Sequence, residues 1–392
     1  MIELLLQPEV QHFIKDHENH DPFSLSLKHK EIGGVPIKWV AEQIASRKRA
    51  KSKLPEWYNT KDLIFPPQIS MEQCSSEATA KYKADLVNGS TMYDFTGGYG
   101  IDCYYLSKHF KRSIYLEKQS HLCELATHNF KALSSNIEVI NAESTLYVSE
   151  IEKADLIYID PARRDNNSQK VVLLKDCEPD VTTLLAQLKG KSKEVLIKTS
   201  PMLDIQLALQ SLNNVKSVHV VSVNNECKEV LYHIDFTANH KTEIVTVNLQ
   251  KKDNQTFSFF PNEEVESQAP LSDTKQFLYE PNSSVLKAGA FNTVATHYGA
   301  FKVHPNTHLY TSKELIENFP GRKFKVERLL PYNKKKILSA LEGKKANITT
   351  RNFPEEVKNI RKKTGITDGG DQYIFAFTDK NNQKMAAITR KA

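Results

Sequence analysis

The first part of the chain places apolar residues at helical spacing. Residues 10–16 and 35–50 repeat apolar side chains every three or four positions, which predicts two amphipathic helices. Pro36 is compatible with the second helix because proline is accepted in a first turn. A further helix is predicted to begin near Ser75 or Ser76, either of which can act as its N-cap, and to reach residue 87. We expect this helix to cover the site that the next strand builds.

Short apolar runs alternate with helical segments in the middle of the chain. Strands are predicted at residues 91–95, 113–116, 137–140, 154–159 and 194–198. The helices predicted after them are 101–106, 121–131, one ending near 151, 181–188 and 203–212. Two more strands, 217–223 and 228–236, can pair as a hairpin around Asn224 and Asn225. The pattern predicts a Rossmann-like, seven-stranded α/β sheet that ends in an antiparallel hairpin.

The pattern changes after residue 237. Residues 243–249 and 256–260 alternate like a second hairpin, and the polar stretch 261–274 is typical of a linker. Strands at 277–279 and 307–310 with a helix over 284–298 predict a small α+β module. The last module is predicted as β-α-β-α-β-β: strands 324–330, 347–350, 373–377 and 385–389, helices 333–341 and 354–364. The expected domains are residues 1–75 (helical), 76–237 (α/β), 238–320 (hairpin, linker and α+β) and 321–392 (basic).

Composition narrows the class of protein. The 392 residues are 40% hydrophobic and 26% charged, which is typical of soluble globular chains of two or three domains. No apolar run of about 18 residues exists and the start lacks the features of a signal peptide, so we expect a cytoplasmic protein without a membrane span. The five cysteines contain no C-x-x-C pair, which argues against disulfides and zinc. His297, His304 and His308 lack acids or cysteines at ligand spacing, so no metal site is expected.

Positive charge is concentrated at the C-terminal end. From Gly321 onward there are 18 Lys and Arg against 7 Asp and Glu, a net charge of +11, whereas the whole chain carries +6. Such an asymmetry favours a polyanionic partner, RNA or DNA, over a merely solvated face. A shorter basic run at residues 47–53 suits a solvated helix end and a nucleic-acid contact equally well. The C-terminal candidates for phosphate binding are Lys334, Lys335, Lys336, Lys344, Lys345, Arg361, Lys362 and Lys363.

The stretch 93–102, Y-D-F-T-G-G-Y-G-I-D, joins the first predicted strand of the sheet to a helix. Its glycines can take positive φ and let a ligand lie against the backbone. A dinucleotide fingerprint needs a third glycine for helix packing, and none stands at that position. Acids at both ends of the loop suit the ammonium and sulfonium of S-adenosylmethionine better than a pyrophosphate. The expected cofactor contacts here are Asp94, Thr96, Gly97, Gly98, Gly100 and Asp102; the bland alternative is a tight turn.

Two further strand ends carry acids. Glu117 ends the second strand, about 20 residues beyond the first, where a nucleotide ribose is usually bound. A charged helix cap is the structural alternative. Ala142 and Glu143 follow the third strand and are placed beside the expected adenine.

The fourth strand runs into Asp160, Pro161, Ala162 and Arg163. Methyl transfer needs an aligned acceptor and, where necessary, a group that takes its proton. Asp160 is the residue best placed to orient the acceptor, while Pro161 stiffens the turn. The motif resembles the D-P-P-Y of nucleic-acid amino methyltransferases, but Ala162 replaces the second proline and Arg163 the stacking aromatic. Arg163 can stack by its guanidinium or hold a phosphate, and we favour direct transfer to a base nitrogen or a ribose oxygen.

Together with D-F-T-G-G-Y-G-I-D and D-P-A-R-R, the segments E-Q-C-S-S-E, A-N-I-T-T-R-N-F-P and T-D-G-G-D-Q-Y resemble a bacterial family of class I S-adenosylmethionine-dependent methyltransferases. Its members carry a ferredoxin-like insert and a C-terminal THUMP-like domain. The resemblance spans nearly the whole chain and implies a methyltransferase that acts on RNA. The alternatives are a protein or small-molecule methyltransferase, and an RNA-binding protein with an inactive methyltransferase core.

Overall fold

The computed structural model describes residues 1–163 and 173–392, and the chain divides into two compact units. The first unit comprises Met1–Lys216 and Leu231–His240, and the second comprises Ser217–Val230 and Lys241–Ala392. Within the described ranges, no helix is both long and apolar enough to span a membrane. Each unit is built around its own apolar core.

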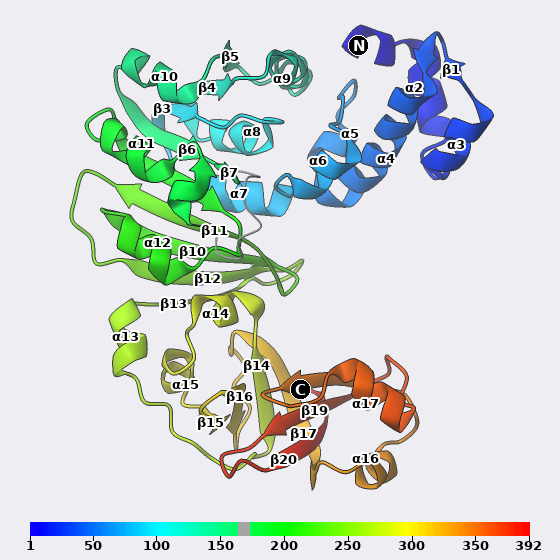
Figure 1. Ribbon diagram of the computed structural model, residues 1–392, viewed down its shortest axis with the longest axis vertical. Helices are drawn as coiled ribbons and strands as arrows, with labels where there is room; N and C mark the ends of the chain where they lie inside the picture. Colours follow the sequence, from blue (N-terminus) through cyan, green and yellow to red (C-terminus); the bar gives the residue numbers. More distant parts are fainter. Residues whose placement is uncertain (164–172) are drawn as a thin grey trace. The chain divides into compact units, whose positions relative to one another are not determined.

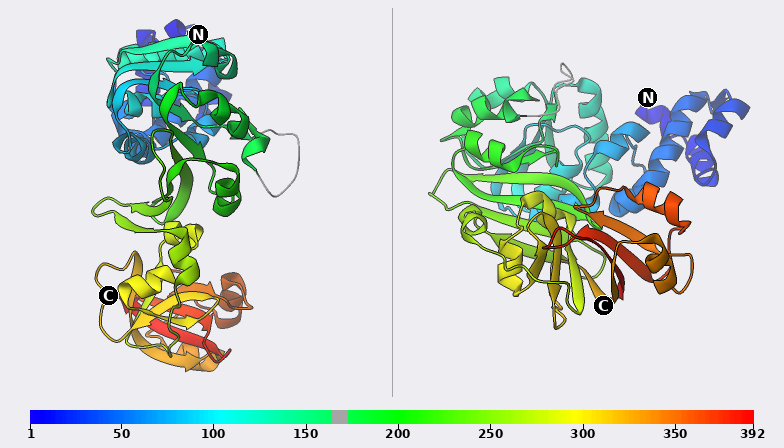
Figure 2. Two further views of the ribbon diagram at one scale, coloured as in Figure 1. Left: turned by 90° about the vertical axis from the view of Figure 1, so that its left-hand side faces the viewer. Right: turned by 60° about the horizontal axis from the view of Figure 1, so that its bottom comes forward.

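The N-terminal helices, blue in Figure 1 and Figure 2, form a group beside the strands of the first unit. Their bounds are α1 Ile2–Leu5, α2 Pro8–Asp16, α3 Pro22–Lys28, α4 Ile37–Lys53 and α5 Pro55–Asn59. Val10, Ile14, Val40 and Ile44 are buried together between α2 and α4, which confirms both predicted amphipathic helices. The second begins at Ile37 because the preceding two residues pair as strand β2 (Val35–Pro36) with β1 (Glu31–Ile32).

Two short helices precede the sheet. Helix α6 spans Gln68–Gln73 and α7 spans Glu77–Asp85. Ser76 is the N-cap of α7: its side chain accepts from the Thr79 amide, and the Thr79 hydroxyl accepts from the Ser76 amide. This reciprocal cap fixes the start of α7. Ser75 is thereby left to contact the next part of the chain.

The large sheet has the strand order β13-β12-β10-β11-β9-β6-β3-β4-β5. Its first-unit strands are β3 Gly89–Asp94, β4 Phe110–Glu117, β5 Ile137–Asn141, β6 Ala154–Ile159 and β9 Ser192–Thr199. They pair in parallel, with Asp94 opposite Tyr115 on one side and Tyr158 on the other. The chain leaves β3 toward β4 and later returns to β6, so the topology switches direction there. Ligands bind at such a switch point, at the carboxyl ends of the strands.

The helices that connect these strands are α8 Ile101–Ser107, α9 Ser120–Ala132, α10 Ser144–Tyr147, α11 Val181–Leu188 and α12 Ile205–Ser211. A 3-10 turn, Val148–Glu150, follows α10. Two small strands, β7 Ala162–Arg163 and β8 Cys177–Glu178, pair antiparallel after β6. The bounds of β6 and α11 agree residue for residue with those predicted. The doubly wound α/β architecture is thus confirmed.

The predicted hairpin consists of β10 Val215–Val223 and β11 Glu226–Asp235. Asn224 and Asn225 form its turn with φ of 49° and 66°. Both lie in the left-handed region that a type I′ turn requires and that asparagine tolerates. The second predicted hairpin is β12 Glu243–Leu249 with β13 Gln255–Phe259, and β12 runs parallel to β10.

The second unit contains a sheet of order β15-β16-β14-β17-β20-β19-β18. Its strands are β14 Phe277–Pro281, β15 Phe301–His304, β16 Thr307–Ser312, β17 Gly321–Pro331, β18 Asn347–Arg351, β19 Gln372–Thr378 and β20 Lys384–Lys391. Its helices are α13 Pro261–Glu266, α14 Ser283–Ala288, α15 Thr293–Tyr298, α16 Lys334–Ala340 and α17 Val357–Thr364. Ile337 of α16 and Ile360 of α17 are buried with Ile348, Ile374 and Ile388 of the sheet, so both helices cover one face of it.

Two predictions for this unit were wrong in detail. The stretch 261–274 is not wholly linker, because α13 begins at Pro261, a residue suited to a first helical turn. The single helix predicted over 284–298 is two helices. Gly289, at φ 76°, ends α14 in the left-handed conformation that stops a helix.

Candidate functional site

The glycine loop lies at the carboxyl end of β3. Gly98 and Gly100 have φ of 52° and 75°, so both use the conformation that favours glycine. Gly97 is needed for a different reason: a Cβ at this position would lie 2.3 Å from the Tyr115 ring. The loop is therefore packed directly on the neighbouring strand β4.

Strand β4 also holds the loop by hydrogen bonds. The Tyr115 hydroxyl donates to the Gly98 carbonyl at 2.5 Å, and the Gly98 amide donates to the Glu117 carboxylate at 3.0 Å. Glu117 also accepts from the amide of Gln119 at 2.8 Å. Both peptide groups of Gly98 are thus fixed from the same strand.

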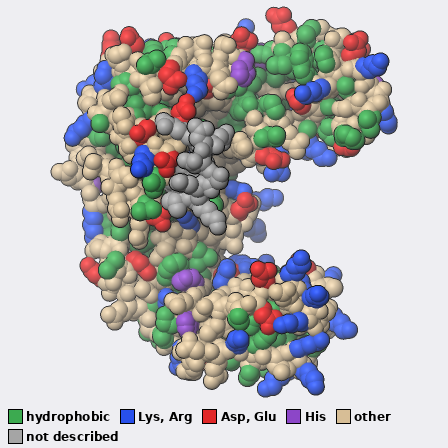
Figure 3. Space-filling view, in the orientation of Figure 1, with side chains coloured by type: hydrophobic (Ala, Val, Ile, Leu, Met, Phe, Trp, Pro, Cys, Tyr) green, Lys and Arg blue, Asp and Glu red, His purple; other side chains and the backbone are tan. Residues whose placement is uncertain are grey.

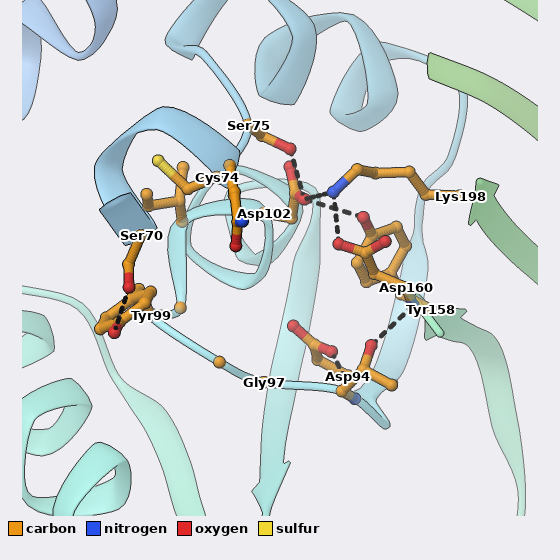
Figure 4. A pocket seen from close by; sticks show the side chains of 15 residues that line it. Ser70, Cys74, Ser75, Asp94, Gly97, Tyr99, Asp102, Tyr158, Asp160 and Lys198 are labelled. Carbon is orange, nitrogen blue, oxygen red and sulfur yellow. Dashed lines mark hydrogen bonds and ion pairs between the residues drawn. The ribbon is translucent and has the colours of Figure 1, made fainter. Parts of the chain in front are cut away.

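A cavity of about 220 Å3 opens over this loop, all of it within the first unit (Figure 4). The loop, the segment around α6, and the ends of β6 and β9 line it. The lining residues are Ser70, Gln73, Cys74, Ser75, Asp94, Thr96, Gly97, Gly98, Tyr99, Gly100, Ile101, Asp102, Tyr158, Asp160 and Lys198. Tyr99 donates to the Ser70 hydroxyl at 2.9 Å, which joins the loop to α6.

Asp94 is almost completely buried, with 1% of its surface exposed. Burial raises the pKa of Asp94 to about 8, and the charges of Asp102, Asp160 and Glu117 act in the same direction. The Thr96 amide donates to its carboxyl at 3.0 Å, which partly offsets the rise. The group is consequently protonated at neutral pH and ready to ionise beside a cation.

Asp102, in the first turn of α8, contacts four other side chains at the cavity. Ser75 and Tyr158 donate to its Oδ2 at 2.7 and 2.8 Å. Lys83 Nζ lies 3.2 Å from Oδ1, and Lys198 Nζ lies 3.6 Å from Oδ2. Burial alone would raise the pKa of Asp102, but the two lysines and the two hydroxyls outweigh it and hold the pKa at about 2.

Asp160 follows β6 and has 37% of its side chain exposed in the cavity. Lys198 Nζ donates to its Oδ2. The Asp160 amide donates to Thr96 Oγ1 at 2.6 Å, so the glycine loop and the end of β6 are bonded to each other. The backbone of Arg163 pairs with Cys177, and its side chain lies outside what the structure describes.

The structure gathers most of the predicted site. Asp94, Thr96, Gly97, Gly98, Gly100, Asp102 and Asp160 all line one cavity. Glu117, Ala142 and Glu143 lie outside that lining, at the ends of β4 and β5, where the Ala142 amide donates to the Glu117 carbonyl at 3.1 Å. Pro161 also lies outside it. Glu117 nevertheless reaches the loop through the Gly98 amide.

Sequence reasoning missed the lysines and hydroxyls of the cavity. Tyr158 could have been found, because residues two apart on a strand share a face and Tyr158 precedes Asp160 by two. Lys198 ends a predicted strand that is adjacent to β6 in the sheet. Lys83 had a weaker signal: it is a lysine on the apolar side of a helix, and it is fully buried. Cys74 also lines the cavity, with its thiol 3.3 Å from the Met71 carbonyl.

These groups suit a cationic ligand better than a phosphate. A pyrophosphate would need a free helix N-terminus, and the first turn of α8 instead carries the ionised Asp102. Asp94, buried with a raised pKa, gains a partner if a ligand brings an ammonium or sulfonium to it. The residues present therefore fit S-adenosylmethionine. Among the described residues, no group of three or more His, Cys, Asp or Glu side chains could hold a metal ion.

The eight predicted phosphate contacts lie on α16, on α17 and on the loop between α16 and β18, and Figure 3 shows Lys and Arg gathered over this part of the surface. Lys334, Lys335 and Lys336 are exposed, as are Lys344 and Lys345. Lys362 is also exposed. Lys363 pairs with Glu355 at 2.9 Å.

Arg361 is used internally. Its guanidinium donates to the carbonyls of Ala346 and Ile366 at 3.3 and 3.2 Å and pairs with Asp368. Among the described contacts of the eight residues predicted to bind phosphate, Arg361 therefore has the most partners within its own domain.

Known proteins resemble both units. A ferredoxin-like domain model matches residues 277–320, and a model described as THUMP domain-like matches residues 321–391. No curated protein matches the sequence. The crystal structure of a candidate methyltransferase from Porphyromonas gingivalis W83 is 33% identical, covers 98% of this chain and 97% of that chain, and superposes with a TM-score of 0.87. TrmK of M. capricolum, solved with S-adenosyl-homocysteine, is 13% identical and covers 43% of this chain and 71% of its own, with a TM-score of 0.32.

Proposed function

Because this chain belongs to the family of class I S-adenosylmethionine-dependent methyltransferases that carry a ferredoxin-like and a THUMP-like domain, we propose that it methylates RNA, a tRNA or an rRNA. The observation that carries the proposal is the position of Asp160. It stands at the end of β6, partly exposed, in the same cavity as the glycine loop. Methyl donor and acceptor would meet there.

The loop residues would hold the cofactor. Gly97, Gly98 and Gly100 would let it lie against the backbone, and Asp94 would face a positive group of the ligand. Glu117, Ala142 and Glu143 would take the nucleoside part, with Glu117 at the ribose. S-adenosylmethionine supplies a methyl group on a positively charged sulfur, so little covalent help from the protein is needed.

Asp160 would orient the acceptor. Its carboxylate can accept a hydrogen bond from an N–H or O–H and take the proton as the methyl group is transferred. Pro161 would stiffen the turn beside it, and Arg163 would contact the substrate base or a phosphate. These roles suit direct transfer to a base nitrogen or a ribose oxygen.

RNA binding is supported by the THUMP-like match and by the net charge of +11 from Gly321 onward. Lys334, Lys335, Lys336, Lys344, Lys345 and Lys362 would contact phosphates. Arg361 and Lys363, which have internal partners, would contribute less.

The test is transfer of labelled methyl from S-adenosylmethionine into total RNA and total protein from cells that lack this chain. We expect label in an RNA fraction with the wild type and none with Asp160→Ala. Asp253→Ala is the matched control, because Asp253 is an exposed aspartate in the loop between β12 and β13. Label in protein alone would favour a protein methyltransferase, and the absence of label in any fraction would contradict the proposal.

A further inference from the structure

Four charged side chains form a continuous chain of contacts in the cavity. Lys83 contacts Asp102, Asp102 contacts Lys198, and Lys198 contacts Asp160. The four come from α7, α8, β9 and the end of β6. Ser75 and Tyr158 bond the middle of this chain at Asp102 (Figure 4).

The burial of Lys83 indicates the role of this series of charged contacts. Its side chain is fully buried, and a buried charge is costly unless it has a partner. Lys83 balances Asp102, so the pair is close to neutral. Lys198, which is 13% exposed, contacts Asp102 and also donates to Asp160. Without Lys83, two carboxylates would compete for one ammonium.

Asp160 shares its ammonium partner with another carboxylate. Lys198 Nζ also lies 3.6 Å from Asp102, and the buried carboxyl of Asp94 lines the same cavity. Among the side chains that the structure describes, Lys198 from β9 and, more remotely, Lys83 from α7 are the cations found here. The thiol of Cys74 and the hydroxyl of Tyr158 also line the cavity. Removing Lys198 takes away the ammonium group that donates to Asp160 Oδ2 and holds the direction of this carboxylate.

We propose that Lys198 is a positioning residue for methyl transfer, which orients the carboxylate of Asp160 toward the acceptor, and that Asp102 with Lys83 fixes Lys198. The inference rests on the proposed function, since it takes Asp160 as the group that orients the acceptor. Lys198 thereby acts on the reaction through Asp160.

The experiment compares Lys198→Met and Lys198→Arg with the wild type in kcat and KM for methylation of RNA and in cofactor affinity by calorimetry. The matched control is Lys193→Met. Lys193 lies on the same strand and pairs with Asp155 at 2.6 Å, outside the cavity. For Lys198→Met we expect kcat lower by roughly 10 to 100-fold, because the Asp160 carboxylate loses the donor that orients it. Cofactor affinity should change by less than about threefold, and Lys198→Arg, which keeps a positively charged donor, should recover part of the rate.

Several results would overturn the inference: an unchanged kcat in Lys198→Met, an arginine variant no better than methionine, or an equal loss of kcat in Lys193→Met. Failure of the proposed function has a different signature, namely no methylation of RNA by the wild type. In that case, carbon-13 NMR of the Asp160 carboxyl, assigned with Asp160→Asn, decides the inference by itself. The chemical shift of this carboxyl carbon should change in Lys198→Met and hold in Lys193→Met, and an unchanged chemical shift in Lys198→Met would refute the role of Lys198.

Discussion

Asp94 and Asp102 stand at the two ends of one glycine loop and line the same cavity, yet they are held in opposite protonation states. The pKa of Asp94 is raised to about 8 by burial, whereas that of Asp102 is lowered to about 2. The difference lies in the partners. Asp102 has two lysines and two hydroxyls, while the Thr96 amide donates to Asp94.

Asp94→Asn should change how stability depends on pH. An acid whose pKa is raised on folding, from about 3.9 unfolded to about 8 folded, favours the folded state when protonated. Its contribution is full at low pH and is lost as the pH rises through about 4 to 8. The wild type should therefore lose more thermal stability between pH 6 and 9 than the variant does. If the melting temperatures of the two proteins change with pH by the same amount across that range, the raised pKa of Asp94 is refuted.

Asp160→Asn should separate binding from transfer. The amide keeps the size of the side chain but cannot take a proton, so we expect the transfer rate to fall by about 100-fold or more. Calorimetry should show cofactor affinity within about threefold of the wild type, because the glycine loop is unchanged. Turnover that stays near the wild-type rate would remove Asp160 from the mechanism.

Gly97→Ala tests the packing of the loop. The added Cβ would lie 2.3 Å from the Tyr115 ring, so the loop or the ring must move. We expect a loss of roughly 1 to 3 kcal/mol in the free energy of unfolding together with weaker cofactor binding. Gly343→Ala is the control, since a Cβ there meets no atom within 4 Å. Denaturation measures the stability of both variants, and calorimetry measures their cofactor affinity. Equal losses in Gly97→Ala and Gly343→Ala would contradict the role of Gly97 in packing the loop.

Replacing Lys334, Lys335 and Lys336 together by Gln should weaken RNA binding. Counterion release predicts an affinity lower by roughly 10 to 100-fold at low salt and a shallower dependence of affinity on salt. The melting temperature should hold, because the N-cap of α16 is Asn333 and positive charges at a helix N-terminus are not stabilising. Binding titrations at several salt concentrations check this, with Lys251→Gln and Lys252→Gln, from the exposed β12 to β13 loop, as control.

Arg361→Ala should act mainly on the fold. The guanidinium bonds two carbonyls and pairs with Asp368, so its removal should cost about 1 to 3 kcal/mol in the free energy of unfolding. Its exposed neighbour Lys362 has the opposite expectation: Lys362→Ala should weaken RNA binding and leave stability nearly unchanged. Urea denaturation of both variants would show whether this division holds.

The sequence pattern predicted the bounds of an element well where recognisable turn or cap residues stand at both of its ends. Strand β6 is an apolar run closed by the Asp160-Pro161 turn, and its bounds were predicted to the residue. The Asn224 and Asn225 turn was predicted because asparagine accepts positive φ. Gly289 is likewise a residue that accepts positive φ, and it ends α14. It was overlooked because the residues on both sides of it have apolar spacing typical of one continuous helix.

Contacts between distant segments could not be predicted in this way. Ser75 and Asp102 are 27 residues apart, and Lys198 and Asp160 are 38 apart. The spacing of residues along one element carries no information about which side chains another element brings to it. Asp102 was accordingly predicted as a cofactor contact, and its bonds to Lys83 and Tyr158 were found only in the fold.

Both peptide groups of Gly98 are fixed by Tyr115 and Glu117. Strand β4 therefore fixes the shape of the loop through the protein's own hydrogen bonds. Preorganisation of this kind spares a ligand the entropy of arranging its own site. It also implies that the loop discriminates between ligands by shape, since it cannot adjust to a larger one without giving up its bonds to β4.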